Sequence, residues 1–260
     1  MKRNKKKSLK KAPVFLLVVA AVLLLASTVG STQAALIYYT EDAYVADVKV
    51  SNIGVSLYEN AEKINYRDYI KNGEWNTPAS GEVVPLMTSL KDVKIVPGIS
   101  YSEDLQVVNS GAIDSYVRVI ITKYWADKDG NKVRYWNNTE EETLRLNPAY
   151  IKLIAPEDSN WTKAADSTEE REIYYYNQVL PVGNKTDRVV SYVKIDPAVS
   201  KEVIQTVDGN KYAYEYKYDG YQSVVEVEVD AVQTHNAKDA IKSAWGVDVT
   251  VAANGSLSLN

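Results

Sequence analysis

The stretch SVVEVEVDAV, residues 223–232, alternates apolar and polar side chains along most of its length. The apolar positions lie two residues apart and would share one face of an extended chain: Val225, Val227, Val229 and Ala231. The positions between them are acidic: Glu226, Glu228 and Asp230. A period of two is typical of a β-strand with one face in the core and the other in water. We therefore predict an antiparallel strand here, with a wet acidic side.

Three other segments have strand composition and are bounded by turn residues: Val48–Glu59, Tyr101–Asn109 and Tyr116–Trp125. Their β-branched and aromatic side chains suit a pleated, half-buried surface. The stretch REIYYYNQ, residues 171–178, places tyrosines on both faces of an extended chain, so we expect a strand buried on both sides.

Turn residues separate the expected strands at Asp127–Asn131, Asp208–Asn210 and Asn254–Gly255, and these sites predict hairpins. A calcium loop is the alternative at the first site, because Asp127, Asp129 and Asn131 alternate. Gly130 comes too early for such a loop and no acidic residue occupies its twelfth position, so a plain turn is favoured.

One helix is expected from Asn236 to Trp245, with Asn236 or Thr234 as its cap and Gly246 after its end. Its apolar stripe consists of Ala237, Ala240, Ile241, Ala244 and Trp245. We interpret 148–160 as a strand edge and loop, and 168–172 as a short helical turn.

Many short antiparallel strands with one or two short helices in connections predict an all-β fold, a two-sheet β-sandwich of jelly-roll or immunoglobulin-like form. The sequence has no internal repeat and no low-complexity linker, so residues 35–260 are expected to form a single domain.

The first 34 residues have the layout of an export signal. Seven basic residues lie among the first eleven, and an unbroken apolar run of 13 residues follows, Val14–Ala26. A membrane-spanning helix needs about 20 apolar residues, so a cleaved signal peptide is favoured over an uncleaved anchor. Thr32 and Ala34 supply small residues at the −3 and −1 positions, so we expect cleavage before Ala35 and no other contact with a membrane.

Removal of the signal would leave 226 residues and change the formal net charge from −4 to −11, because the signal holds seven basic and no acidic residues. An acidic surface repels nucleic acid, so we expect no such partner. Cysteine is absent, which excludes disulfides, thiolate metal sites and cysteine nucleophiles.

A sticky segment directly follows the expected cut: Leu36, Ile37, Tyr38 and Tyr39. Burying these side chains would stabilise the protein by at most about 10 kcal/mol. The segment, as part of an N-terminal strand over residues 35–45, either folds onto its own sandwich or completes the sheet of a neighbouring copy. The second arrangement repeats head to tail and gives a filament, with the chain itself as its partner.

Three blocks carry a resemblance to a known family: Thr32–Asn60, Val93–Ile121 and Val229–Gly246. The first has the small-x-Ala motif followed by an aromatic residue and a Thr-acid pair. The second has the turns Pro97-Gly98 and Asn109–Gly111 and the strand Tyr116–Val119, and the third ends its helix in Trp-Gly. In order and spacing these blocks resemble the TasA/camelysin family of secreted biofilm-matrix proteins. Residues 65–84 have no counterpart in that pattern.

The resemblance implies a jelly-roll-like sandwich that is processed by the signal peptidase SipW and reaches the extracellular matrix or cell surface of a Gram-positive bacterium. It also implies a fibre subunit that polymerises by exchange of its N-terminal strand, with accessory matrix proteins as further partners.

A tyrosine series is found at Tyr212, Tyr214, Tyr216 and Tyr218, in the stretch KYAYEYKYDGY. A strand here would present all four on one face, as a patch above the roughly 400 Å² that soluble monomers tolerate. We favour burial in the core, and keep a subunit contact and a sugar-stacking surface as alternatives.

Two alternatives to a structural role are a camelysin-like surface metallopeptidase and a cell-surface adhesin or glycan-binding protein. Zinc hydrolases take two or three histidines, whereas this chain has only His235, expected at a helix start or on the surface. No nucleophilic triad or carboxylate pair stands out. We therefore expect no enzymatic activity, no catalytic residue, no metal site and no cofactor.

Overall fold

The computed structural model describes residues 52–78, 90, 93–133 and 146–260. The chain divides into two compact units, Met1–Ala35 and Leu36–Asn260, and all described residues belong to the second unit. The predicted signal peptide, its cleavage residues Thr32, Ala34 and Ala35, and the segment 36–39 lie outside the described residues.

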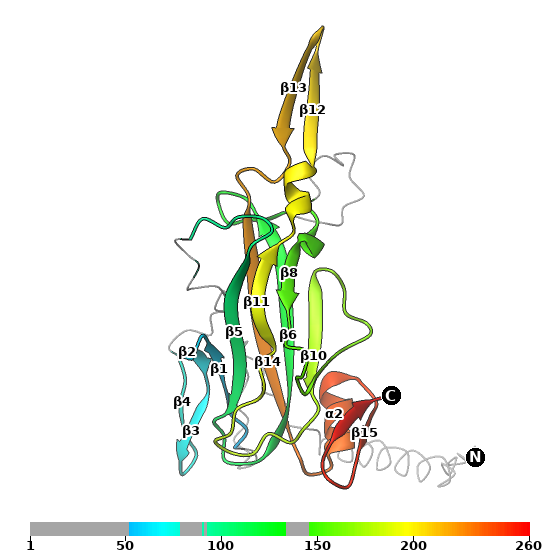
Figure 1. The fold of residues 1–260 in the computed structure, drawn as a ribbon. Helices are drawn as coiled ribbons and strands as arrows, with labels where there is room; N and C mark the ends of the chain where they lie inside the picture. The colour runs from blue at the N-terminus through cyan, green and yellow to red at the C-terminus, as the bar shows by residue number, and fades with distance from the viewer. Residues whose placement is uncertain (1–51, 79–89, 91–92, 134–145) are drawn as a thin grey trace, which may run out of the picture. The chain divides into compact units, whose positions relative to one another are not determined.

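Two antiparallel sheets form the body of this unit (Figure 1). The first has the order β2-β1-β5-β11-β8, with β1 at Val55–Glu59, β2 at Glu62–Tyr66, β5 at Ser100–Asn109, β8 at Ile151–Ile154 and β11 at Val190–Ile195. The second has the order β14-β6-β10-β9, with β6 at Ser115–Ala126, β9 at Trp161–Lys163, β10 at Arg171–Tyr176 and β14 at Gln222–Gln233, and β7 at Lys132–Val133 also pairs with β6. The prediction of an all-β sandwich is confirmed.

Three two-stranded hairpins extend the fold: β3 (Asp68–Lys71) with β4 (Glu74–Asn76), β12 (Val203–Asp208) with β13 (Lys211–Tyr216), and β15 (Val249–Val251) with β16 (Leu257–Leu259). The connections hold the 3₁₀ helices η3 (Pro148–Tyr150) and η4 (Pro197–Lys201) and the α-helix α2 (Ala237–Trp245). In the described ranges, no helix is long and apolar enough to cross a membrane.

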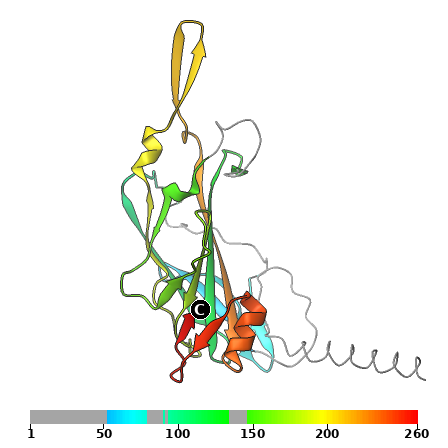
Figure 2. The ribbon, with the colours of Figure 1, turned by 90° about the vertical axis from the view of Figure 1, so that its right-hand side faces the viewer.

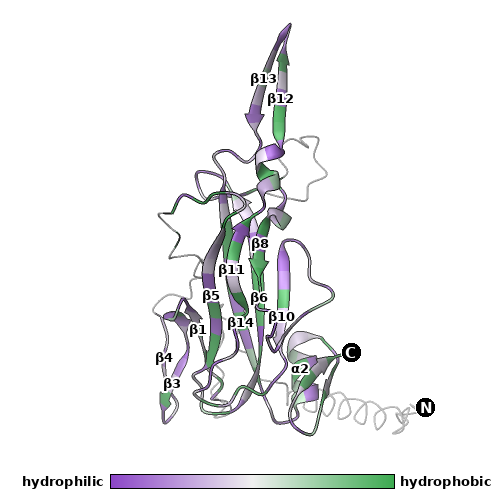
Figure 3. Ribbon diagram, in the orientation of Figure 1, coloured by the Kyte–Doolittle hydropathy of each residue, from purple (hydrophilic) through white to green (hydrophobic). Residues whose placement is uncertain are grey.

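The core lies between the two sheets, and every second residue of the main strands points into it. On β14 these are the apolar positions predicted from the sequence, Val225, Val227, Val229 and Ala231. They meet alternate residues of β6, such as Val117, Val119 and Ile121, which are fully buried. Figure 3 shows the resulting alternation of apolar and polar bands on the long strands. The expected hairpin turns at Asp127–Asn131, Asp208–Asn210 and Asn254–Gly255 are also confirmed.

Helix α2 covers part of the outer face of the second sheet, and its predicted stripe is buried. Gly246 follows it in a left-handed conformation, with φ +74°, and donates its backbone N–H to the carbonyl of Lys242. The expectation for the outer face of β14 was partly wrong. Asp230 is fully buried, and its carboxylate accepts hydrogen bonds from Arg118. The guanidinium of Arg118 in turn lies 5.3 Å from the ring of Trp245 in α2.

Two further expectations were wrong. Residues 168–172 form no helical turn: Thr168 and Arg171 exchange backbone and side-chain hydrogen bonds in a tight turn, and β10 begins at Arg171. The four tyrosines from 212 to 218 are not all in the core. Only Tyr218 is buried, while Tyr212, Tyr214 and Tyr216 are 62–63% exposed.

The hairpin β12–β13 and helix α2 lie at opposite ends of the sandwich (Figures 1 and 2). The hairpin leads into the start of β14 at Gln222, and α2 follows its end at Gln233. Twelve extended residues span about 40 Å. The first described residues precede Val55, which pairs with Asn109 at the α2 end, so the chain enters the sandwich at the end opposite the hairpin.

Candidate functional site

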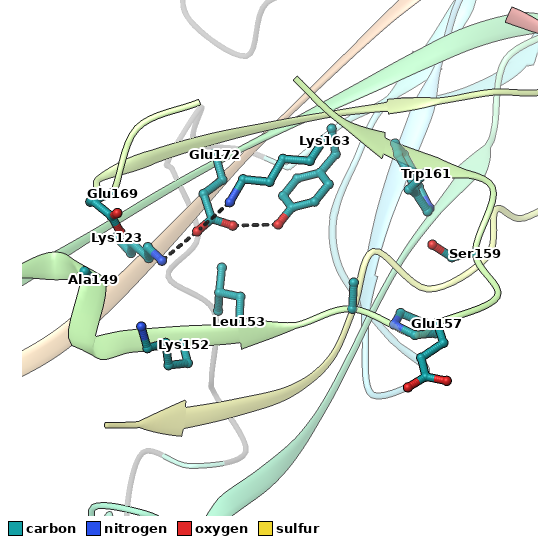
Figure 4. Close-up of a pocket in the computed structure, with 13 residues that line it drawn as sticks. Lys123, Ala149, Lys152, Leu153, Glu157, Ser159, Trp161, Lys163, Glu169 and Glu172 are labelled. Carbon is teal, nitrogen blue, oxygen red and sulfur yellow. Dashed lines mark hydrogen bonds and ion pairs between the residues drawn. The ribbon is translucent and has the colours of Figure 1, made fainter. Parts of the chain in front are cut away.

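An open cleft lies at one side of the sandwich (Figure 4). It is bordered by β8, the last strand of the first sheet, and β9, the last strand of the second. Its volume is about 500 Å³, and its lining includes Lys123, Lys152, Leu153, Glu157, Trp161, Lys163, Glu172 and Tyr174.

A charged cluster occupies the inner wall of this cleft. The carboxylate of Glu172 accepts hydrogen bonds from Lys123 Nζ at 2.6 Å and from the hydroxyl of Tyr174 at 2.6 Å, and it lies 3.2 Å from Lys163 Nζ. Lys123 also donates to the backbone carbonyl of Ile151 at 2.9 Å, which ties β6 to β8 across the interior. The side chains of Lys123 and Glu172 are only 3% and 7% exposed.

The pKa values in the cluster follow from these contacts. Burial alone would raise the pKa of the Glu172 carboxyl, but the hydrogen bonds of Lys123 and Tyr174 and the charges of Lys123 and Lys163 together outweigh it and hold the pKa below its usual range. Burial and the bond to Glu172 raise the pKa of Tyr174 far above its ordinary value. Both groups therefore keep one protonation state around neutral pH, which suits a structural cluster better than a proton-transfer site.

The local sequence explains how these charges reach the interior. Glu172 shares the inward face of β10 with Tyr174 and Tyr176, and Lys123 follows Ile121 on the inward face of β6. From the sequence, a charged residue at an inward position of a strand indicates a buried charge, but it does not indicate which residue pairs with that charge. Sequence reasoning therefore missed this cluster.

The second candidate site is the face of the β12–β13 hairpin that carries three of the four predicted tyrosines. Cross-strand pairing places Tyr216 opposite Val203, Tyr214 opposite Gln205 and Tyr212 opposite Val207. All six side chains therefore share one face, and none of them is charged. An isolated two-stranded hairpin is only marginally stable in water. An exposed apolar face on such a hairpin is unusual in a soluble monomer and is typical of an interaction surface.

Tyr218 has a different role from the other three tyrosines. Its ring packs against Trp125 and Tyr150, with centroid distances of 4.9 and 5.6 Å, and its hydroxyl accepts the backbone N–H of Asn147 at 2.9 Å. It therefore belongs to the core, as favoured from the sequence, and fixes the base of the hairpin; the alternative of an interface does not apply to this residue.

The remaining sequence predictions concern metal binding. Over the described residues, no group of three or more His, Cys, Asp or Glu side chains is arranged to hold a metal ion. His235 lies exposed in the turn before α2, as expected. The acidic turn at Asp127 is closed by its own bonds, because the Asp127 carboxylate accepts the backbone N–H groups of Asp129 and Asn131 at 2.8 and 2.9 Å.

Comparison of the chain with protein-family models, curated proteins and solved structures found no significant match. The class that the fold and site define is therefore a two-sheet antiparallel β-sandwich with an open cleft between two edge strands and an exposed aromatic hairpin.

Proposed function

We propose that this protein is exported and forms an extracellular fibre, in which each copy donates its N-terminal segment 36–39 to the sandwich of the next copy. The observation that carries the proposal is the cleft between β8 and β9. Within the described part of the chain, β8 pairs only with β11 and β9 only with β10, so each presents a sheet edge at the cleft. Backbone groups at such an edge accept an added strand.

Length and charge support the cleft as the acceptor. Strand β8 has four residues and so matches the length of the donor segment Leu36–Tyr39. Glu41 and Asp42 follow that segment in the sequence, and two partly exposed lysines line the cleft, Lys152 and Lys163. Attraction between these two carboxylates and the two lysines would fix the direction in which the added strand lies in the cleft.

The fibre in this proposal belongs to the extracellular matrix or cell surface of a Gram-positive bacterium. SipW releases the donor segment by cutting before Ala35, and accessory matrix proteins are further partners. This processing explains why a cut lies beside so apolar a segment. Before cleavage the segment is joined to the signal peptide, and after cleavage it is a free strand.

The first experiment removes residues 35–39 from the mature chain. We expect the full mature chain to form fibres in electron micrographs and the shortened chain to sediment as a monomer with an unchanged circular dichroism spectrum. Fibres of the shortened chain would refute strand donation. Mass spectrometry of the secreted protein checks that the mature chain begins at Ala35.

The second experiment locates the acceptor and uses the absence of cysteine in the chain. Ile154→Cys on β8, 39% exposed, is combined with one cysteine at each position from 36 to 39. A strand added to β8 brings facing Cα atoms within about 5.5 Å, which allows a disulfide. We expect one register to give a ladder of covalent multimers on a non-reducing gel, and each single-cysteine chain to give none beyond a dimer. Fibres without a ladder in any register would exclude β8 as the acceptor.

A further inference from the structure

The β12–β13 hairpin bears an apolar surface that the donated strand does not use. Its tyrosine face consists of the side chains of Val203, Gln205, Val207, Tyr212, Tyr214 and Tyr216. The two valines are 49% and 56% exposed and the tyrosines 62–63%. The face therefore offers roughly 500 Å² of mostly apolar surface, above what monomers commonly leave in water.

The hairpin is firmly held at its base, so this face has a defined position. Lys217 donates its backbone N–H to the carbonyl of Glu202 at 3.0 Å, and its ammonium lies 3.2 Å from the Glu202 carboxylate. The hydroxyl of Tyr150 donates to the same carboxylate at 2.5 Å, and Tyr218, the residue after Lys217, packs against Trp125 in the core. Gly209 has φ +58° at the first position of the two-residue loop, as a type II′ turn requires.

We propose that the tyrosine face binds a second copy of this chain, against the end of the sandwich opposite the hairpin. This inference rests on the proposed fibre, and it names a second contact between successive subunits. Head-to-tail copies bring the hairpin end of one subunit to the α2 end of the next, because the hairpin and α2 lie at opposite ends of β14.

Exposed apolar side chains at the α2 end supply the other half of this contact. Ile70, near the tip of the β3–β4 hairpin, is 55% exposed, and Val182 is 46% exposed. Tyr69 donates its backbone N–H to Ser110, and Val182 donates its own to Asp114, so both lie where β5 ends and β6 begins. That is the same end of the sandwich as α2.

Area and charge favour a second copy over other occupants. A stable protein interface buries about 800 Å² on each side, so the tyrosine face alone is too small for an independent dimer. It suits a contact that acts together with the donated strand. The donated strand already holds two copies together, so it raises the effective concentration of the tyrosine face at the surface of the neighbouring copy. The face is also uncharged on a mature chain whose formal net charge would be −11, so copies approach through it without direct repulsion.

The test compares three forms of the mature chain: wild type, a triple variant of the tyrosine face with Tyr212→Ser, Tyr214→Ser and Tyr216→Ser, and a control on the opposite face of the same hairpin with Thr206→Ser and Ala213→Ser. We expect all three to have the same melting temperature, since the substituted side chains are exposed. The critical concentration for fibre formation should rise at least tenfold in the triple variant and stay unchanged in the control. An unchanged critical concentration in the triple variant overturns the inference while the fibre stands.

A photocrosslink identifies the occupant and separates this inference from the fibre. The mature wild-type chain carries benzoylphenylalanine at position 214, and crosslinked peptides are mapped. Crosslinks to peptides holding Ile70 or Val182 of a second copy support the inference, even if electron microscopy finds no fibres and the proposed function fails. Crosslinks to a polysaccharide added to the same sample, with none between copies, overturn it in favour of a sugar-stacking surface. The absence of any crosslink between copies in fibres also overturns it.

Discussion

The turn at Asn109–Gly111 packs against the first described residues, 52–54, and shows how tightly the sandwich is packed. The side-chain amide of Asn109 donates to the carbonyls of Ile113 and Leu180 at 2.9 and 2.8 Å, and its oxygen accepts the backbone N–H of Gly111 at 3.0 Å. A Cβ on Gly111 would lie 2.4 Å from the carbonyl oxygen of Asn52 and 2.5 Å from the backbone nitrogen of Gly54. The Asn-x-Gly turn therefore needs glycine for space.

We expect Gly111→Ala to lower the free energy of unfolding by about 3 kcal/mol or more, because two backbone segments must move apart. Gly130→Ala is the matched comparison. A Cβ there meets nothing within 4 Å, but φ is +83°, so only conformational strain of about 1 kcal/mol is expected. Urea unfolding followed by circular dichroism measures both values, and equal effects would contradict the packing argument.

Glu172→Gln tests the buried cluster at the same scale. The substitution leaves the ammonium of Lys123 buried beside a neutral amide, and breaking a buried pair in this way costs about 3 kcal/mol. Glu169→Gln, an exposed change in the lining of the same cleft, should have no measurable effect. Urea unfolding at pH 7 measures both. A loss below about 0.5 kcal/mol in Glu172→Gln would show that the carboxylate does not offset the buried charge.

The difference between wild type and Glu172→Gln should depend on pH. Because the folded pKa of Glu172 lies below its ordinary value of 4.5, the carboxylate contributes stability that is present above that value. This contribution is lost as the pH falls through the lower, folded pKa. The two unfolding free energies should therefore differ by a constant amount from pH 6 to 8 and converge as the pH falls below 4.5 and through the lower, folded pKa. A difference that grew on acidification would mean that the folded pKa is raised.

Among the elements, helix α2 and the β12–β13 hairpin are attached in opposite ways. Helix α2 buries its whole apolar stripe, and Trp245 lies 5.6 Å from the ring of Tyr175 on the outer face of the second sheet. The hairpin exposes nearly all of its residues, and its strands contact mainly each other. The helix is therefore part of the folded body, whereas the hairpin is a local extension whose cross-strand pairs hold it together.

Excision of the hairpin tests this difference. Replacing residues 204–215 by Asn-Gly keeps the cross-strand pair at the base of the hairpin, Val203 and Tyr216, and joins the two residues by a turn suited to a hairpin. We expect the melting temperature to change by less than about 2 °C, because few contacts with the sandwich are removed. Differential scanning calorimetry provides the measurement, with Trp245→Ala as a control that should cost about 3 kcal/mol or more. A large loss on excision would show that the hairpin belongs to the cooperative unit.

At the scale of the whole molecule, assembly must overcome charge. The mature chain would carry a formal net charge of −11, so copies that approach one another repel. The proposed contacts between copies are a backbone strand addition and an uncharged aromatic face. Neither gains much from opposite charges, apart from the acidic end of the donated strand.

Salt should therefore promote fibre formation. Raising sodium chloride from about 20 to 300 mM shortens the screening length from roughly 20 Å to 6 Å, so repulsion between subunits weakens. We expect the critical concentration, measured by sedimentation of the mature chain, to fall severalfold. The melting temperature of the chain without residues 35–39 serves as the control and should change little. A critical concentration that rises with salt would indicate attraction between opposite charges at the contacts.

The sequence by itself determined the strands β1, β5, β6, β10 and β14, the three hairpin turns and helix α2. The alternation of 223–232, the glycine turns and the stripe ending in Trp245 are local patterns, and backbone geometry converts them directly into elements. The sandwich followed because many amphipathic strands without repeats must bury their apolar faces against each other.

Only the tertiary structure decided which faces are covered and which charges meet. Alternation predicts that the two faces of a strand differ, but not what lies against each, so Asp230 is buried beneath α2 while Tyr212, Tyr214 and Tyr216 are exposed. Likewise Lys123 and Glu172, 49 residues apart in the chain, become partners because β6 and β10 are neighbours in one sheet. Burial and long-range pairing depend on the positions of elements distant in sequence, and no local periodicity carries that information.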